Sequence, residues 1–109
     1  MNIAILGSTG SIGNSTLEVI RQNKKDFAIN ILTAKSNHQL LLEQCKEFNP
    51  EFIYLEDEQA TKIFKENALE EKLQTCVIQS LNELEKVIGS NETDIVVAGM
   101  VGIAGLTPV

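Results

Sequence analysis

The run Ile3-Ala4-Ile5-Leu6-Gly7-Ser8-Thr9-Gly10-Ser11-Ile12-Gly13 decides how this chain folds. Its first four residues are apolar and lead directly into glycines, a pattern typical of a strand buried in a parallel sheet. After the glycines, a set of mainly apolar residues recurs at helical spacing: Ile12, Thr16, Val19 and Ile20. This set predicts the apolar face of a helix that begins near Ser11 and ends around residues 23–25.

The rest of the chain repeats this alternation of apolar runs and helical patterns. Further strands are predicted at residues 28–33, 52–55, 76–78 and 95–98. The predicted helices between them are marked by Leu41, Cys45 and Phe48, then by Ala60, Ile63, Phe64 and Ala68, and last by Leu81, Leu84, Val87 and Ile88. Asn49-Pro50 should end the first of these helices, since proline disfavours helix at the residue before it. Ser80-Leu81-Asn82-Glu83 predicts a capping box at the start of the last one, and Gly89 its C′ residue.

Strands that alternate with helices favour right-handed βαβ units. We therefore expect an α/β fold: a Rossmann-like, doubly wound, mostly parallel sheet with helices on both faces. The 109 residues suffice for one such domain, residues 1–109. The chain stops at Val109, where a crossover helix should begin, which predicts a fragment that is incomplete at its C-terminal end.

The glycine loop has the chemistry of a pyrophosphate site. Gly7 permits a tight turn, Gly10 lets a phosphate approach the backbone, and Gly13 lets the helix pack against the sheet. The hydroxyls of Ser8, Thr9 and Ser11 add hydrogen-bond donors, and the helix N-terminus favours an anion. The alternative is a purely structural turn. A mononucleotide P-loop is excluded, because its spacing of Gly, four residues and Gly-Lys-[Ser/Thr] does not occur here.

The end of the second predicted strand indicates which dinucleotide binds. NAD-binding domains usually carry an acid there to accept hydrogen bonds from the ribose. This chain has Lys35, Ser36 and Asn37 instead. A lysine with two polar donors suits the 2′-phosphate of NADPH, so we expect NADPH rather than NADH. The competing interpretation, compatible with the first, is that Ser36 or Asn37 caps the next helix.

Little else in the sequence points to chemistry. A second glycine cluster, Gly99–Gly105, is expected either to approach the cofactor from the other side or to form a plain turn. His38, the only histidine, is expected to be a solvated residue at a helix start without a catalytic role. Cys45 and Cys76 are expected to be buried free thiols in a reducing compartment. The sequence shows no catalytic pair and no metal-ligand cluster.

Composition excludes some partners. Nine Lys and Arg against 15 Asp and Glu give a net charge of −6, which argues against nucleic-acid binding. The acidic residues in the middle of the chain are expected to lie on solvated helix faces. The N-terminus lacks the features of a signal peptide, and no apolar run is long enough to span a membrane. We expect a cytoplasmic protein.

With these residues in view, the chain resembles the start of the 1-deoxy-D-xylulose 5-phosphate reductoisomerases. The matching segments are Ile3–Gly13, Ser15-Thr16-Leu17, Gln44-Cys45-Lys46-Glu47-Phe48-Asn49-Pro50 and Val101-Gly102-Ile103-Ala104-Gly105-Leu106-Thr107-Pro108. The resemblance covers essentially the whole chain.

The resemblance implies a homodimeric enzyme that rearranges 1-deoxy-D-xylulose 5-phosphate and reduces the product with NADPH to 2-C-methyl-D-erythritol 4-phosphate, in isoprenoid synthesis. It implies Mg²⁺ or Mn²⁺, whose carboxylate ligands lie beyond Val109, as do the substrate-binding residues. Thr9, Gly10, Ser11 and Ile12 would hold the cofactor phosphates, and Lys35–Asn37 the 2′-phosphate.

The chain departs from the family pattern at this second place. Many members have Gly-Lys-Asn or Gly-Arg-Asn where Lys35-Ser36-Asn37 stands, so the basic residue is displaced by one position. Which side chain contacts the 2′-phosphate therefore stays open. By itself the chain is expected to bind NADPH weakly and to catalyse nothing.

Two other interpretations remain at this level. One is the cofactor domain of a different NADP-dependent oxidoreductase, a semialdehyde dehydrogenase or an extended short-chain dehydrogenase. The other is a dinucleotide-sensing module without chemistry.

Overall fold

The computed structural model describes residues 2–90 and 93–98 of the chain. The strands are β1 (Asn2–Leu6), β2 (Ala28–Ala34), β3 (Phe52–Leu55), β4 (Cys76–Val77) and β5 (Ile95–Ala98). The helices are α1 (Ser11–Gln22), α2 (His38–Phe48), α3 (Glu58–Glu70) and α4 (Leu81–Ser90). Every predicted strand lies within one residue of its expected bounds, and each predicted helix is present.

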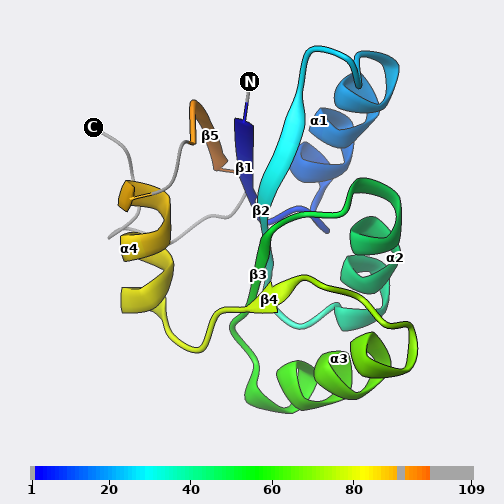
Figure 1. The fold of residues 1–109 in the computed structure, drawn as a ribbon, viewed down its shortest axis with the longest axis vertical. Helices are drawn as coiled ribbons and strands as arrows, with labels where there is room; N and C mark the ends of the chain where they lie inside the picture. Colours follow the sequence, from blue (N-terminus) through cyan, green and yellow to red (C-terminus); the bar gives the residue numbers. More distant parts are fainter. Residues whose placement is uncertain (1, 91–92, 99–109) are drawn as a thin grey trace.

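The five strands form one sheet in the order β4-β3-β2-β1-β5, and all four pairings are parallel. The chain moves outward from β1 to β4 and then returns past β1 to add β5. Because right-handed crossovers in opposite directions place their helices on opposite faces, α1, α2 and α3 cover one face and α4 covers the other (Figure 1). The predicted Rossmann-like, doubly wound arrangement is confirmed, and the order reverses between β1 and β5.

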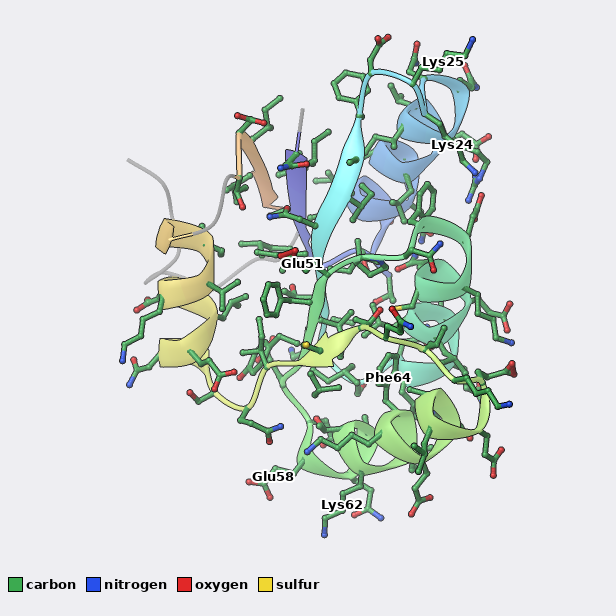
Figure 2. The ribbon with its side chains drawn as sticks, in the orientation of Figure 1. Lys24, Lys25, Glu51, Glu58, Lys62 and Phe64 are labelled. Atoms are coloured by element: carbon green, nitrogen blue, oxygen red, sulfur yellow. The ribbon has the colours of Figure 1, made fainter. Side chains whose placement is uncertain are left out.

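Alternation along the strands divides the core into two layers. On β1, Ile3 and Ile5 belong to the larger cluster under α1–α3, whereas Ala4 faces the smaller cluster under α4. The ring of Phe64 is fully buried and points from α3 toward the sheet, while Glu58 and Lys62 of the same helix extend into solvent (Figure 2). The sheet is thus covered by apolar side chains on both faces.

The apolar face predicted for α1 is correct at Ile20 and wrong at Ile12 and Val19. The structure buries Gly13, Leu17 and Ile20, and leaves Ile12 57% and Val19 58% exposed. The helix is rotated relative to the prediction because Gly13, with no side chain, allows the closest approach to the strand end. The spacing of apolar residues alone therefore predicted a partly wrong face of the helix, since it gave no weight to a glycine.

Three smaller predictions concern the chain after β3. Ser80 caps α4 as expected, since its hydroxyl oxygen accepts a hydrogen bond from the Glu83 N–H at 3.2 Å. Gly89 is not a C′ residue, because α4 continues through it to Ser90. Cys76 is exposed rather than buried, since the two-residue strand β4 lies at the edge of the sheet.

Other expectations about the surface are confirmed or corrected in part. The acidic residues of the middle region are exposed, as expected: Glu56, Asp57, Glu58, Glu66, Glu70 and Glu71. His38 lies at the start of α2, as expected, but it is half-buried rather than fully solvated. Within the described ranges, none of the helices has both the length and the apolar character needed to cross a membrane.

Candidate functional site

The glycine loop lies at the carboxyl end of β1, and the end of β2 anchors it. Gly7 N–H donates to both the carbonyl and the hydroxyl oxygen of Thr33, each at 3.0 Å, and Ser8 N–H donates to the same carbonyl at 2.8 Å. Gly7 has a φ of 84°, a left-handed conformation that favours glycine. Gly10 N–H then closes the turn on the Gly7 carbonyl at 3.0 Å. The loop is therefore held in one shape by buried backbone contacts.

The N-terminus of α1 offers unused hydrogen-bond donors. Its N-cap is Gly10, which provides no side-chain acceptor, and the first helical turn contains no acidic residue. The N–H groups of Ser11, Ile12 and Gly13 precede the first intrahelical hydrogen bond, donated by Asn14 N–H to the Gly10 carbonyl at 2.9 Å. Together with the partial positive charge of the helix end, these donors have the chemistry needed to bind an anion.

Gly13 is required for the close packing of loop and helix. A Cβ added there would lie 2.3 Å from the Gly7 carbonyl oxygen and 2.5 Å from the Ser8 Cα. Gly10 is less restricted, since a Cβ would meet only the Gly7 oxygen at 3.4 Å. The role assigned to Gly13 from the sequence is supported by this geometry, whereas Gly10 contributes mainly an open surface.

A buried polar side chain that sequence reasoning missed contacts the loop from α2. Gln44 is 4% exposed, and its amide hydrogen-bonds both the hydroxyl and the carbonyl oxygen of Ser8, at 2.6 Å and 2.9 Å. The available signal was its position three residues after Leu41, on the face of α2 that packs inward. A glutamine at a core position requires a buried partner.

The Lys35–Asn37 segment follows β2 at the same edge of the sheet. All three residues are exposed. Asn37 caps α2, since its Oδ1 accepts from Leu40 N–H at 3.2 Å, so the capping interpretation is correct for Asn37. Lys35 forms no ion pair with any of the residues that the structure describes, so its ammonium group is available to a ligand.

A larger concavity lies elsewhere. It measures about 920 Å³ and is lined by residues at the amino ends of the strands, among them Asn2, Asn30 and Thr75. In open parallel sheets, ligands bind outside the carboxyl ends of the strands at the point where the order reverses. We therefore place the site at the glycine loop, where a shallower hollow of about 320 Å³ runs along Ser11, Ile12 and Ser15.

The remaining chemistry-bearing residues do not form a reactive centre. Burial raises the pKa of the Cys45 thiol to about 12, so it is a protonated core residue. His38 stands alone. Over residues 2–90 and 93–98, no group of three or more His, Cys, Asp and Glu residues could hold a metal ion. The second glycine cluster, Gly99–Gly105, lies outside the described residues.

A five-stranded parallel sheet with a glycine loop at its reversal point defines this chain as a Rossmann-like α/β domain. The family model described as 1-deoxy-D-xylulose 5-phosphate reductoisomerase matches residues 3–109. The chain belongs to that reductoisomerase family.

Individual relatives give the same result. The reductoisomerase of Clostridium perfringens is 42% identical over 106 residues, which are 97% of this chain and 28% of that protein. The one from Buchnera aphidicola is 35% identical, over 97% of this chain and 27% of that protein. The chain thus spans about 27% of the length of the curated relatives it matches.

Solved structures agree with this assignment. A DOX-P reductoisomerase in complex with NADPH, fosmidomycin and magnesium superimposes with a TM-score of 0.87 at 35% identity, over 97% of this chain and 26% of that one. The Zymomonas mobilis reductoisomerase in complex with NADPH has a TM-score of 0.65 at 29% identity, over 70% of this chain and 20% of that one. The predicted fold and family are confirmed.

Proposed function

We propose that residues 1–109 form the NADPH-binding region of a 1-deoxy-D-xylulose 5-phosphate reductoisomerase. The full-length enzyme would convert that phosphorylated sugar to 2-C-methyl-D-erythritol 4-phosphate in isoprenoid biosynthesis. When bound, NADPH supplies the hydride for the reduction. This region contributes the cofactor's position and no catalytic group.

One observation carries the proposal: the uncapped N-terminus of α1 directly follows a rigid glycine loop at the reversal point of the sheet. The cofactor's pyrophosphate would lie there, over Gly7, Thr9, Gly10, Ser11, Ile12 and Gly13. Backbone N–H groups and the helix dipole would bind its negative charge. The NADPH bound in the related structures supports the identity of the cofactor.

The adenosine end of NADPH would lie over Lys35, Ser36 and Asn37. Thr33, two residues before Lys35, connects this segment to the glycine loop, because its carbonyl and hydroxyl oxygens both accept hydrogen bonds from Gly7 N–H. The exposed ammonium of Lys35 would pair with the 2′-phosphate, and Ser36 would donate its hydroxyl. Asn37 already caps α2, so its backbone is a better candidate than its side chain.

The metal belongs to another part of the enzyme in this proposal. The described residues offer no suitable ligand set, whereas related structures contain magnesium. We place the metal and substrate ligands in the family's sequence that follows residue 109. A homodimer and a cytoplasmic location complete the proposal, on the basis of the family resemblance and the two free thiols.

The test is a parallel titration of the 109-residue chain with NADPH and NADH, followed by amide NMR shifts. We expect shifts at Thr9–Gly13 and Lys35–Asn37, and weaker changes with NADH at the second segment. Equal responses to both cofactors would contradict the NADP assignment. Silence from a folded sample, repeated on the full-length enzyme, would contradict the cofactor site itself.

A pair of lysine variants sharpens the test in the full-length enzyme. Lys35→Gln should weaken NADPH binding roughly 10-fold, as expected for a charge-assisted phosphate contact, and leave NADH binding unchanged. Lys62→Gln is the matched control, because Lys62 extends into solvent from α3 (Figure 2). An equal loss for both variants would show that only the overall charge matters.

A further inference from the structure

The amide of Gln44 is fixed in one orientation by Ser8. The Ser8 carbonyl oxygen can only accept a hydrogen bond, so the atom facing it at 2.9 Å must be the Gln44 NH₂ group. The Gln44 Oε1 then accepts from the Ser8 hydroxyl at 2.6 Å. Both residues are buried, Ser8 completely. The side chain of Gln44, on α2, therefore forms two hydrogen bonds with Ser8, the second residue of the glycine loop.

Asn14 forms further hydrogen bonds with the next two residues of the loop. Its Nδ2 donates to the carbonyl oxygens of Thr9 at 3.2 Å and Gly10 at 3.0 Å, and its Oδ1 lies 3.4 Å from the Gln44 Nε2. Three consecutive loop carbonyls, those of Ser8, Thr9 and Gly10, thus accept hydrogen bonds from two side-chain amides. The amides form one connected network that begins at Gln44.

Holding the carbonyls determines where the loop N–H groups point. In a trans peptide the C=O and N–H of one unit point in opposite directions, and the described chain contains no cis peptide. Gln44 holds the Ser8 carbonyl toward the network, and Asn14 holds the Gly10 carbonyl through both its side-chain amide and its backbone N–H. The N–H groups of Thr9 and Ser11 must therefore point away from the network. The Gly10 N–H is used within the turn, on Gly7.

We propose that Gln44 is a positioning residue for the cofactor: it orients the peptide units of the glycine loop so that the Thr9 and Ser11 N–H groups face the pyrophosphate. Gln44 itself, buried beneath the loop, does not contact the cofactor. This inference rests on the proposed function, because it needs a dinucleotide on the outer side of the loop.

The same residue links the two halves of the proposed site. Gln44 belongs to α2, whose first turn is capped by Asn37 at the 2′-phosphate segment. The loop is therefore fixed to the helix that also carries the adenosine end. A loop released from Gln44 should lose affinity for the pyrophosphate while the 2′-phosphate segment stays intact.

The test uses full-length enzyme with Gln44→Met, which keeps the side-chain length but removes both hydrogen bonds to Ser8 and the contact with Asn14. We expect the dissociation constant for NADPH to rise roughly 10-fold or more, since the buried Ser8 carbonyl loses the Gln44 donor and the Ser8 hydroxyl keeps only a long contact to the Thr33 carbonyl at 3.4 Å. The KM for 1-deoxy-D-xylulose 5-phosphate should change less than about twofold, because the loop orients only the cofactor. Gln22→Met, at an exposed position that ends α1, is the control.

A second probe separates positioning from general damage. Adenosine 2′-monophosphate carries the 2′-phosphate but no pyrophosphate, so its inhibition constant should stay within about twofold in Gln44→Met. An equal loss for adenosine 2′-monophosphate and NADPH would overturn the positioning role, as would unchanged NADPH affinity. If wild-type enzyme bound no NADPH, the proposed function itself would fail.

Ser8→Ala covers the case in which Gln44→Met does not fold. It removes only the hydroxyl that donates to Gln44 and keeps the carbonyl contact. We expect a smaller rise in the NADPH dissociation constant, about 3- to 10-fold, again without an effect on adenosine 2′-monophosphate. Unchanged NADPH affinity in Ser8→Ala would overturn the inference.

Discussion

Helices α1 and α3 begin at the same edge of the same sheet, yet their first turns are built in opposite ways. The N-cap of α3 is Asp57, whose carboxylate accepts from Ala60 N–H at 2.8 Å, and Glu58 adds a second negative charge. The N-cap of α1 is Gly10, with no side-chain acceptor and no acid in the first turn. One helix end is neutralised by its own chain, and the other is left open.

The difference shows which of the two helix ends has the chemistry to accept an anionic ligand. An anion approaching α3 would meet two carboxylates, whereas one approaching α1 would meet free N–H groups. Leaving a glycine at an N-cap costs only a few tenths of a kcal/mol relative to Asp or Asn, because water can satisfy the exposed donors. The uncapped end of α1 therefore leaves backbone N–H groups open at little cost in stability.

The largest expected effect on stability comes from adding a side chain at Gly13, where α1 packs against the glycine loop. Gly13→Ala should lower the free energy of unfolding by about 3 kcal/mol or more, since the new Cβ would overlap backbone atoms of Gly7 and Ser8 that cannot move aside. Urea unfolding of the 109-residue chain measures this.

The matched control is a glycine inside α4. A Cβ at Gly89 would meet no atom within 4 Å, so Gly89→Ala should raise stability by about 0.5–1 kcal/mol through helix propensity. Equal effects of the two substitutions would contradict the close packing of α1 on its loop.

The second prediction concerns a substitution that gives α1 the same N-cap residue type as α3. Gly10 has φ −85° and ψ 179°, which any residue can adopt, so Gly10→Asp should fold. It should stabilise the chain by a few tenths of a kcal/mol and weaken NADPH binding roughly 30-fold or more, because a carboxylate then occupies the anion site. Urea unfolding and fluorescence titration of full-length enzyme measure the two effects.

Gly10→Asn separates charge from capping in the same experiment. Its amide oxygen can cap the helix without a negative charge, so binding should fall less than in Gly10→Asp. If both variants bound NADPH as tightly as the wild type, the open end of α1 would not be the phosphate site.

A third prediction concerns removal of the side-chain cap at the N-terminus of α3. Asp57→Ala should lower the free energy of unfolding by about 1 kcal/mol through the lost cap, with no change in NADPH affinity. Glu66→Ala, at an exposed position of the same helix, should change stability by less than about 0.5 kcal/mol. Thermal and urea unfolding of both variants provide the comparison, and a loss of NADPH affinity in Asp57→Ala would contradict it.

The smallest expected effect is at the other end of α1, where Arg21 binds Glu47 of α2 and also Glu18 at 2.6 Å. The hydrogen bond from Arg21 holds the pKa of Glu47 below its usual value of 4.5. A lowered folded pKa means that the contribution is present above about pH 4.5 and is lost as pH falls through the folded value.

Glu47→Gln should therefore lower the Tm by about 2 °C or less at pH 7, because exposed ion pairs contribute little. The difference should vanish in acid. Glu85→Gln, on the exposed surface of α4, is the control. A deficit that persists in acid would assign the effect to packing rather than to the ion pair.

Local patterns predicted the order of strands and helices well, and failed where packing between distant segments decides burial. Phe52–Leu55 and the helix around Phe64 were found because apolar spacing is a local property. Cys76 was misplaced, since a short apolar run does not show that its strand lies at the edge of the sheet.

By itself, the sequence determined the glycine loop between a strand and a helix, the absence of an acid after the second strand, and the family. Only the tertiary structure decided which stripe of α1 is buried, because Gly13 faces Gly7 and Ser8 across the loop. It also decided that Ser8 pairs with Gln44, a residue 36 positions away on another helix. Neither contact is encoded in a local period: both arise where the fold brings α1, α2 and the end of β1 together.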